Sequence, residues 1–263
     1  MGPRSLLAMI ALAGVLAAPE ASALVLESFQ TPFPANMCLP NSGAPVVFSG
    51  AYCDGSVCPP DPVSTCGTGY FADQTAAPGV WQGAPRRAEV GSGLGTRANA
   101  QILPGIGQLE VHHLEGGGSG SAHSLVLKYG DASAPLDLDL QALGFTGVRM
   151  PITCESNPFY PLHVIVRLRG DLLDPGGPVA RAAAYVTESR LLTLPLEAFV
   201  ISNGFSFSDV HQIQINFIDG CLSIGCEPMV IPTRNYSIGS ISIDSGATAT
   251  SPRSWGGLKV RYR

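Results

Sequence analysis

Short segments of alternating apolar and polar residues recur along this 263-residue chain, and they limit its possible folds more than any other feature. Segments such as "QLEVHHL" and "LHVIVRLR" alternate with the period of a strand that has one buried face. Clusters of Gly, Pro, Asp and Ser separate these segments, whereas no window keeps apolar residues at helical spacing over successive turns. The pattern predicts an all-β protein, an antiparallel β-sandwich or jelly roll.

Ten segments carry the clearest strand pattern. They are residues 24–29, 45–49, 86–90, 108–114, 124–130, 147–152, 162–169, 182–188, 211–219 and 237–244. Neighbouring side chains of a strand point to opposite sides, so alternation also predicts which residues leave the core. A short helical turn is expected within "PLDLDLQALGF".

The first 23 residues are typical of a secretory signal peptide. Arg4 supplies a positive start, an apolar run follows at 6–18, and Ala21 and Ala23 precede the expected cleavage point, so the mature chain would begin at Leu24. The apolar run is too short to span a bilayer, and no later segment reaches the length of a transmembrane helix. We therefore expect a secreted or cell-surface protein with no transmembrane segment in the mature chain.

An exported chain is expected to use its cysteines for disulfide bonds, because thiols pair in an oxidising compartment. Zinc sites of the two-pair type use C-x2-C knuckles, whereas four residues separate Cys53 from Cys58 and Cys221 from Cys226, so metal binding is the less favoured alternative. An odd number of cysteines leaves one over, and the connectivity stays open. The disulfide candidates are Cys38, Cys53, Cys58, Cys66, Cys154, Cys221 and Cys226.

Composition divides the rest of the chain into a domain and a tail. Residues 24–244 form the expected β-sandwich, and 31–83, rich in Pro, Cys and Gly, is interpreted as a disulfide-stapled loop excursion from it. Residues 245–263 contain a small-residue linker, "SGATATSP", and a basic tail, "RSWGGLKVRYR". The formal net charge of −5 gives no basic footprint for nucleic acid, so we expect no nucleic-acid partner.

Two strands place long hydrogen-bonding side chains on the expected outer surface. With Leu162 and Ile213 assigned to the core, alternation turns the polar residues of both strands outward. Such a surface suits a sugar ligand, and an ordinary solvated sheet face is the alternative. Trp81, Phe159 and Tyr160 are the candidate aromatic platforms for a sugar ring. The ligand-binding candidates are His163, Arg167, Arg169, Gln212, Gln214, Asn216 and Trp81.

Metal and hydrolase motifs are weak in this sequence. The metalloprotease motif H-E-x-x-H is absent, and a strand would point His112 and His113 to opposite faces. One of these histidines with Glu110 or Glu115 is a minor metal-site alternative. The stretch "GGGSGSAHS", with Ser119 and Ser121, matches the G-x-S-x-G hydrolase motif only loosely and suits a hairpin loop better.

Asp137 and Asp139 are the paired carboxylates considered for glycoside cleavage. On a strand they would share a face at about 7 Å, which is within the range that glycosidases use. An ordinary half-buried strand shows the same alternation of apolar and acidic residues. We therefore assign no catalytic residue.

Four stretches resemble a broad group of exported bacterial proteins, most of which have no assigned activity. The stretches are "LESFQTPFP", "PLDLDLQALGFTGVRMPI", "GFSFSDVHQIQINF" and "YSIGSISID". Those proteins look like jelly rolls of the galactose-binding type, and the resemblance covers 24–244 outside the excursion. It implies a carbohydrate-binding-like scaffold and not an activity. It further implies that the first and last strands pair, which would bring Glu27 near Ser242 or Asp244, and that Glu27 and Asp244 hold a structural calcium ion, the one cofactor expected.

The C-terminal tail resembles short tails of the form W-G-x-L/I-K-x-x-Y/F-R on some exported bacterial proteins, which implies a sorting or attachment signal. A disordered basic end or a last edge strand is the alternative. Taken together, these features favour a secreted, non-catalytic β-sandwich whose partner is a glycan or another cell-surface component. A secreted polysaccharide-active enzyme and a structural or adhesion protein displayed through its tail are the alternatives.

Overall fold

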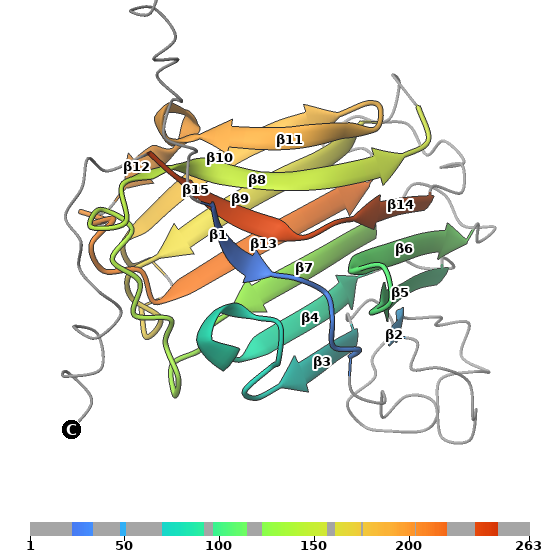
Figure 1. Cartoon of the computed structure of the whole chain (residues 1–263), viewed down its shortest axis with the longest axis horizontal. Helices are drawn as coiled ribbons and strands as arrows, with labels where there is room; N and C mark the ends of the chain where they lie inside the picture. Colours follow the sequence, from blue (N-terminus) through green and yellow to red (C-terminus); the bar gives the residue numbers. More distant parts are fainter. Residues whose placement is uncertain are drawn as a thin grey trace, which may run out of the picture.

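The computed structural model describes residues 23–33, 48–50, 70–91, 97–114, 123–156, 161–174, 176–202, 204–219 and 235–246. Two antiparallel β-sheets pack face to face over one core (Figure 1). In the described residues the only helical elements are two 3-10 turns, η1 (Trp81–Gly83) and η2 (Leu196–Ala198). None of the described helical elements has the length and apolar character needed to cross a membrane. The predicted all-β antiparallel sandwich is confirmed.

The larger sheet has eight strands in the order β1-β15-β8-β14-β6-β5-β2, and β11 pairs with the free side of β8. The first and last strands pair, as the resemblance implies. The bounds are β1 (Ala23–Glu27), β15 (Ile241–Ser245), β8 (Phe145–Cys154), β14 (Asn235–Ile238), β6 (Gln108–Leu114), β5 (Arg97–Leu103), β2 (Phe48–Gly50) and β11 (Arg190–Pro195).

The smaller sheet has seven strands in the order β12-β10-β9-β13-β7-β4-β3. Its central strands pair without a break in register, from β10 through to β4. The bounds are β12 (Val200–Ser202), β10 (Val179–Val186), β9 (Leu162–Arg169), β13 (Gln212–Asp219), β7 (His123–Tyr129), β4 (Arg86–Gly91) and β3 (Tyr70–Gln74).

The core lies between the sheets and includes the inward positions that alternation predicts. The inward residues of β9 and β13 are fully buried. They are Leu162, Val164, Val166, Leu168, Ile213, Ile215 and Phe217. Burial of such side chains contributes about 1.5–3 kcal/mol each, so these two strands hold the smaller sheet against the larger one.

The predicted strand at 237–244 is split into β14 and β15, and Pro151 on β8 lies opposite the break. Proline has no N–H to donate to a ladder, which usually restricts it to strand edges or irregular positions. Here its carbonyl oxygen accepts a hydrogen bond from the N–H of Gly239 at 2.9 Å. A Cβ at Gly239 would lie 3.0 Å from the Cγ of Pro151, so the small residue lets the two chains approach.

Four strands were not among those predicted: β3, β5, β11 and β12. Two strands, β2 and β3, fall within 31–83, so this segment is not only a loop excursion. It contributes an edge strand to each sheet, and β2 and β3 lie near each other at one end of the sandwich (Figure 1). Of the four unpredicted strands, β3, β11 and β12 lie at sheet edges, where a strand needs only one partner and tolerates a weak pattern, whereas β5 pairs with both β6 and β2.

Most cysteines, residues 1–22 of the predicted signal peptide and the tail from 247 lie outside the described residues. Cys154 is described, and it is buried at the end of β8. The other disulfide candidates are Cys38, Cys53, Cys58, Cys66, Cys221 and Cys226, and all of them lie outside the described ranges. The disulfides and their connectivity therefore stay predictions.

Candidate functional site

A row of polar side chains crosses the outer face of the seven-stranded sheet. The strand registers place one outward residue from each of five adjacent strands side by side. In order from β10 to β4 they are Arg181, Arg167, Gln214, Lys128 and Arg87. We call these five residues the polar row and the surface around them the polar face. Neighbouring strands lie about 4.8 Å apart, so the row runs about 19 Å.

Glu89 neutralises the β4 and β7 end of the row. Its carboxylate lies 2.8 Å from Nε of Arg87 and 2.7 Å from Nζ of Lys128. All three side chains are partly exposed, so each ion pair contributes little to stability, about 0–1 kcal/mol. The contacts fix the direction of two cationic side chains on an otherwise solvated surface.

The β9 and β10 end of the row holds arginines without such a partner. Arg181 lies opposite Arg167 in the strand register, and Arg169 follows two residues later on β9. Burial, together with the positive charges of Arg181 and Arg169, lowers the pKa of Arg167. Among the residues that the structure describes, no carboxylate lies within ion-pair distance of these arginines, and Arg169 donates through Nη2 to the backbone oxygen of Asp174 at 3.1 Å.

An exposed aromatic ring borders this end of the face. Tyr185 lies opposite His163 in the register, and the two rings stack with centroids 4.5 Å apart and planes 18° apart. Tyr185 is 61% exposed, whereas His163 beneath it is 8% exposed. Burial and the charge of Arg181 lower the pKa of His163, which favours the neutral imidazole. Two residues along β10, the small Ala183 separates Tyr185 from Arg181 on the same face.

The structure brings most of the predicted ligand-binding residues to the polar face. His163, Arg167 and Arg169 point outward from β9, and Gln214 and Asn216 do so from β13. The amide of Gln214 donates through Nε2 to Oδ1 of Asn216 at 2.8 Å, which orders both side chains.

Three outward positions are less open than alternation predicts. His163 is covered by Tyr185, Ile165 is 4% exposed, and Gln212 is buried. Gln212 donates through Nε2 to the backbone oxygen of Gly130 at 2.9 Å, so it links β13 to the end of β7. Sequence reasoning missed Tyr185, although its outward position in the strand "AAAYV" was a usable signal.

A cavity of about 330 Å³ opens beside the end of the polar row. Arg87 and Lys128 form one part of its wall, and Gln212, Asp131 and Gln74 form another. The cavity therefore continues the polar face toward the β3 edge of the sheet. Arg86, a residue that is only 1% exposed, also lines the cavity.

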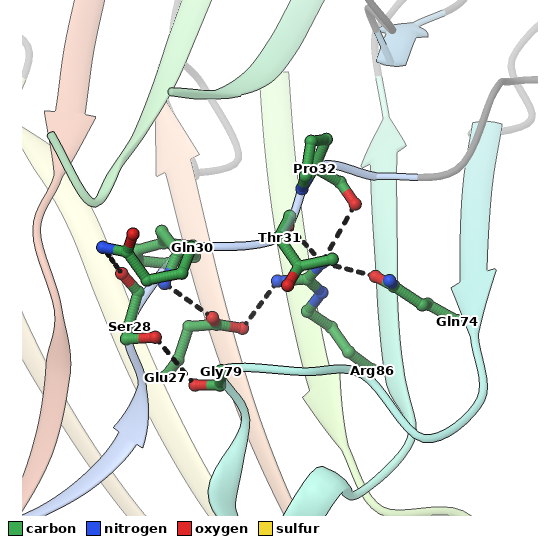
Figure 2. Close-up of polar contacts among 9 residues, drawn as sticks. Glu27, Ser28, Gln30, Thr31, Pro32, Gln74, Gly79 and Arg86 are labelled. Carbon is green, nitrogen blue, oxygen red and sulfur yellow. Dashed lines mark hydrogen bonds and ion pairs between the residues drawn. The ribbon is translucent and has the colours of Figure 1, made fainter. Parts of the chain in front are cut away.

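Arg86 is held by a buried polar network that ties the N-terminal strand to the seven-stranded sheet (Figure 2). Its Nη1 lies 2.9 Å from Oε2 of Glu27, and its Nη2 donates to the backbone oxygen of Thr31 at 2.8 Å and to the side chain of Gln74. Oε1 of Glu27 accepts from the backbone N–H of Phe29 at 2.7 Å. Burial raises the pKa of Glu27, and the guanidinium of Arg86 opposes that rise.

A β-bulge directs the side chain of Glu27 into this network. The β1–β15 register shifts between Val25 and Glu27, and consequently Leu26 and Glu27 are both fully buried. Glu27 lies opposite Ile241, and Asp244 pairs with Arg149 at 3.1 Å. The two carboxylates named for a calcium ion therefore lie at different places, each beside an arginine, and the calcium ion stays a prediction. Among the described residues, no group of three or more His, Cys, Asp or Glu is arranged to hold a metal.

Trp81 does not lie on the polar face. It belongs to η1, in the connection between β3 and β4, and packs against the core. The connection reaches β1 through the bridge between Val80 and Glu27, which is why the indole is drawn toward the interior. The other aromatic candidates, Phe159 and Tyr160, lie outside the described residues.

Asp137 and Asp139 are not strand neighbours. Asp137 has a φ of +49°, and Asp139 accepts the backbone N–H of Ala142 at 2.8 Å in a turn. The leucines that alternate with them, Leu136, Leu138 and Leu140, are buried, as alternation predicts, but in the described residues the segment forms a single bridge, at Leu138. His112 lies near Glu110 at 3.4 Å on β6, on the other sheet. Ser119, Ser121 and Glu115 lie outside the described residues.

No protein-family model matches the sequence, and neither does any curated protein. Several solved structures are similar in fold. A family 11 carbohydrate-binding module from Clostridium thermocellum, in complex with a β-1,3-1,4-mixed-linked tetrasaccharide, has a TM-score of 0.39 and 11% identity over 70% of this chain and 98% of its own. A family 30 carbohydrate-binding module of a cellulosomal cellulase from Clostridium thermocellum has a TM-score of 0.34 and 15% identity over 86% and 99%. A loop-swap mutant of Xyn11A from Necallimastix patriciarum has a TM-score of 0.32 and 6% identity over 61% and 92%.

Proposed function

We propose that this protein is an exported, non-catalytic glycan-binding protein and that the polar face is its binding site. One observation carries the proposal: the exposed ring of Tyr185, fixed by its stack on His163, stands on the same sheet face as a row of long hydrogen-bonding side chains.

The chemistry of a sugar ring matches this combination. A pyranose has apolar C–H groups on its faces and hydroxyl groups around its rim. The ring of Tyr185 can cover the C–H groups, and the guanidinium and amide groups of Arg181, Arg167 and Gln214 can donate to hydroxyl oxygens. Ala183 leaves space between the tyrosine and Arg181 for the edge of a sugar.

Export is part of the proposal and is supported by the sequence of residues 1–23, with disulfides among the cysteines as the matching expectation. The expected place of the protein is outside the cell or at its surface. Display through the tail at 245–263 is the structural or adhesion alternative, and polysaccharide cleavage is the enzymatic one. Binding without cleavage is the role that the geometry of the polar face supports best.

Replacing the exposed ring is expected to weaken glycan binding. In affinity electrophoresis of the full chain against a panel of soluble polysaccharides, Tyr185→Ala should lower affinity for the bound glycan by about tenfold, which corresponds to about 1.4 kcal/mol. The matched control is Leu191→Ala, which removes another exposed apolar side chain from β11 of the other sheet. Thermal unfolding of both variants should stay close to that of the parent protein.

Two results would contradict the proposal. The first is a Tyr185→Ala variant that binds as tightly as the parent, since the aromatic surface would then be irrelevant. The second is the release of new reducing ends from a bound polysaccharide, which would make the protein an enzyme.

A further inference from the structure

The positive charges of the polar face are unevenly neutralised. Arg87 and Lys128 share the carboxylate of Glu89. Arg167, Arg169 and Arg181 have no carboxylate within 4.0 Å in the part of the chain that the structure describes. The nearby loop between β9 and β10 does contain carboxylates, but Asp171 and Asp174 accept backbone N–H groups of that loop.

The three arginines form a cluster that the fold holds together against charge repulsion. Arg167 faces Arg181 across one strand spacing, about 5 Å, and Arg169 lies on the same side of β9 about 7 Å away. Arg167 is partly buried, and the lowered pKa of Arg167 reflects both that burial and its two neighbours. The chain as a whole has a net charge of −5, so the cluster is a local feature and not a general basic character.

The guanidinium group specifies the kind of anion that suits this cluster. Its planar fork donates two parallel hydrogen bonds to one carboxylate or sulfate group. A neutral sugar uses only part of that capacity and leaves the repulsion between the arginines in place. Tyr185 lies four residues from Arg181 on β10, about 14 Å along the strand, so an acidic polysaccharide of several sugars would use both the apolar surface and the charges.

On the basis of the function proposed above, we propose that the polar face binds an acidic polysaccharide whose carboxylate or sulfate groups pair with Arg167, Arg169 and Arg181. The chain of the polysaccharide runs along β9 and β10: a sugar ring rests beside Tyr185, and acidic groups further along the chain lie beside Arg181 and Arg167 and then beside Arg169. The arginine cluster sets the specificity for acidic over neutral glycans.

A single-stranded nucleic acid is the competing anionic polymer, because it also combines charge with stacking. The polar row does not suit a phosphate backbone as well. Glu89 occupies the β4 and β7 end, and Tyr185 is the one exposed ring among the described side chains of this face. The test therefore includes a single-stranded nucleic acid as a probe.

The test measures the affinity of the full chain by biolayer interferometry for matched polymers. The carboxylated probe is polygalacturonate, and its neutral counterpart is the same polymer with its carboxylates methyl-esterified. A sulfated galactan supplies the other anion, and a single-stranded oligodeoxynucleotide supplies phosphate. We expect an acidic polysaccharide to bind at least about tenfold more tightly than the methyl ester. Its affinity should fall by about tenfold or more when the salt concentration is raised from about 0.05 M to about 0.3 M.

Variants then locate the effect. The double variant Arg167→Gln and Arg181→Gln should lose about 10–100-fold in affinity for the acidic polysaccharide, because two charge-assisted contacts are removed. Its affinity for a neutral glycan should change far less. Arg190→Gln removes an exposed arginine from β11 of the other sheet and should bind like the parent protein.

The possible results separate the two proposals. If the methyl ester binds as tightly as polygalacturonate, and the sulfated galactan no more tightly, the acidic specificity is wrong and glycan binding stands. If no polysaccharide binds, both proposals fail. Tighter binding of the oligodeoxynucleotide than of either acidic polysaccharide would also overturn the inference, whereas preference for the carboxylated or the sulfated probe supports it and identifies the group.

Discussion

Replacing Arg86 with methionine is expected to lower the free energy of unfolding by roughly 3–5 kcal/mol near pH 8, because it leaves the carboxylate of Glu27 buried without a cation. Glu27 and Arg86 are both fully or almost fully buried, and the guanidinium also contacts Thr31 and the ring of Phe33. The network joins β1 to β4, so its loss weakens the attachment of the N-terminal strand to the seven-stranded sheet.

The loss of stability in Arg86→Met should be larger at high pH than at low pH. Burial already raises the pKa of Glu27, and loss of the opposing charge of Arg86 raises it further. A carboxyl whose pKa is raised in the folded state contributes its full stability below its unfolded pKa, about 4.3, and loses that contribution as pH rises through the folded pKa. The Arg86→Met variant should therefore lose less stability near pH 5 than near pH 8.

Urea unfolding at both pH values measures the effect, and two variants serve as controls. Glu27→Gln leaves Arg86 buried without an anion and removes the carboxyl that titrates, so its loss of stability should be no smaller near pH 5 than near pH 8, unlike that of Arg86→Met. Arg190→Met removes an exposed arginine from β11 and should stay within about 0.5 kcal/mol of the parent. A loss at Arg86→Met that is the same near pH 5 and near pH 8 would show that Glu27 does not carry the effect.

A second large effect is expected at Gly130, which follows β7 and lines the cavity beside the polar row. Its φ is +81°, and a Cβ there would lie 2.4 Å from the backbone oxygen of His211 and 2.9 Å from Cγ of Leu136. Gly130→Ala therefore combines backbone strain with a clash against backbone, and should lower the free energy of unfolding by roughly 3 kcal/mol or more.

Gly204→Ala is the matched control for Gly130→Ala. Gly204 has a similar φ of +68° but no described atom within 4 Å of its built Cβ. Gly204→Ala should lower the free energy of unfolding only by the cost of placing alanine in the left-handed conformation, about 1–2 kcal/mol. Equal losses in the two variants, measured by urea unfolding, would mean that the close approach of His211 to Gly130 is not a constraint on this fold.

The strands with regular alternation were predictable from sequence because burial of one face repeats every second residue. For β6 and β9 the predicted and observed bounds coincide, and the inward residues of β9 and β13 are all buried. The bulge at Glu27 was not predictable, since one extra residue in a strand leaves no mark on the apolar pattern. Its arginine partner is separated from it by 59 positions in the chain.

The polar face was predicted only in part for a related reason. Alternation turned Arg167 and Gln214 outward, but it did not show that β10, β9, β13 and β7 are neighbours. That arrangement depends on pairings between distant segments, and it brings Arg181 beside Arg167 and Tyr185 onto His163. Trp81 was a reasonable aromatic candidate by composition, and only the packing of η1 against the core removes it from this face.

A map of backbone amide NMR shifts, recorded on titration with the polysaccharide that the chain binds, would locate the binding site directly. If the polar face is the site, the largest shifts fall on β9, β10 and β13, around Arg167, Tyr185 and Gln214. Shifts that instead gather on the outer face of the eight-stranded sheet, around Glu110 and His112 on β6, would contradict the account.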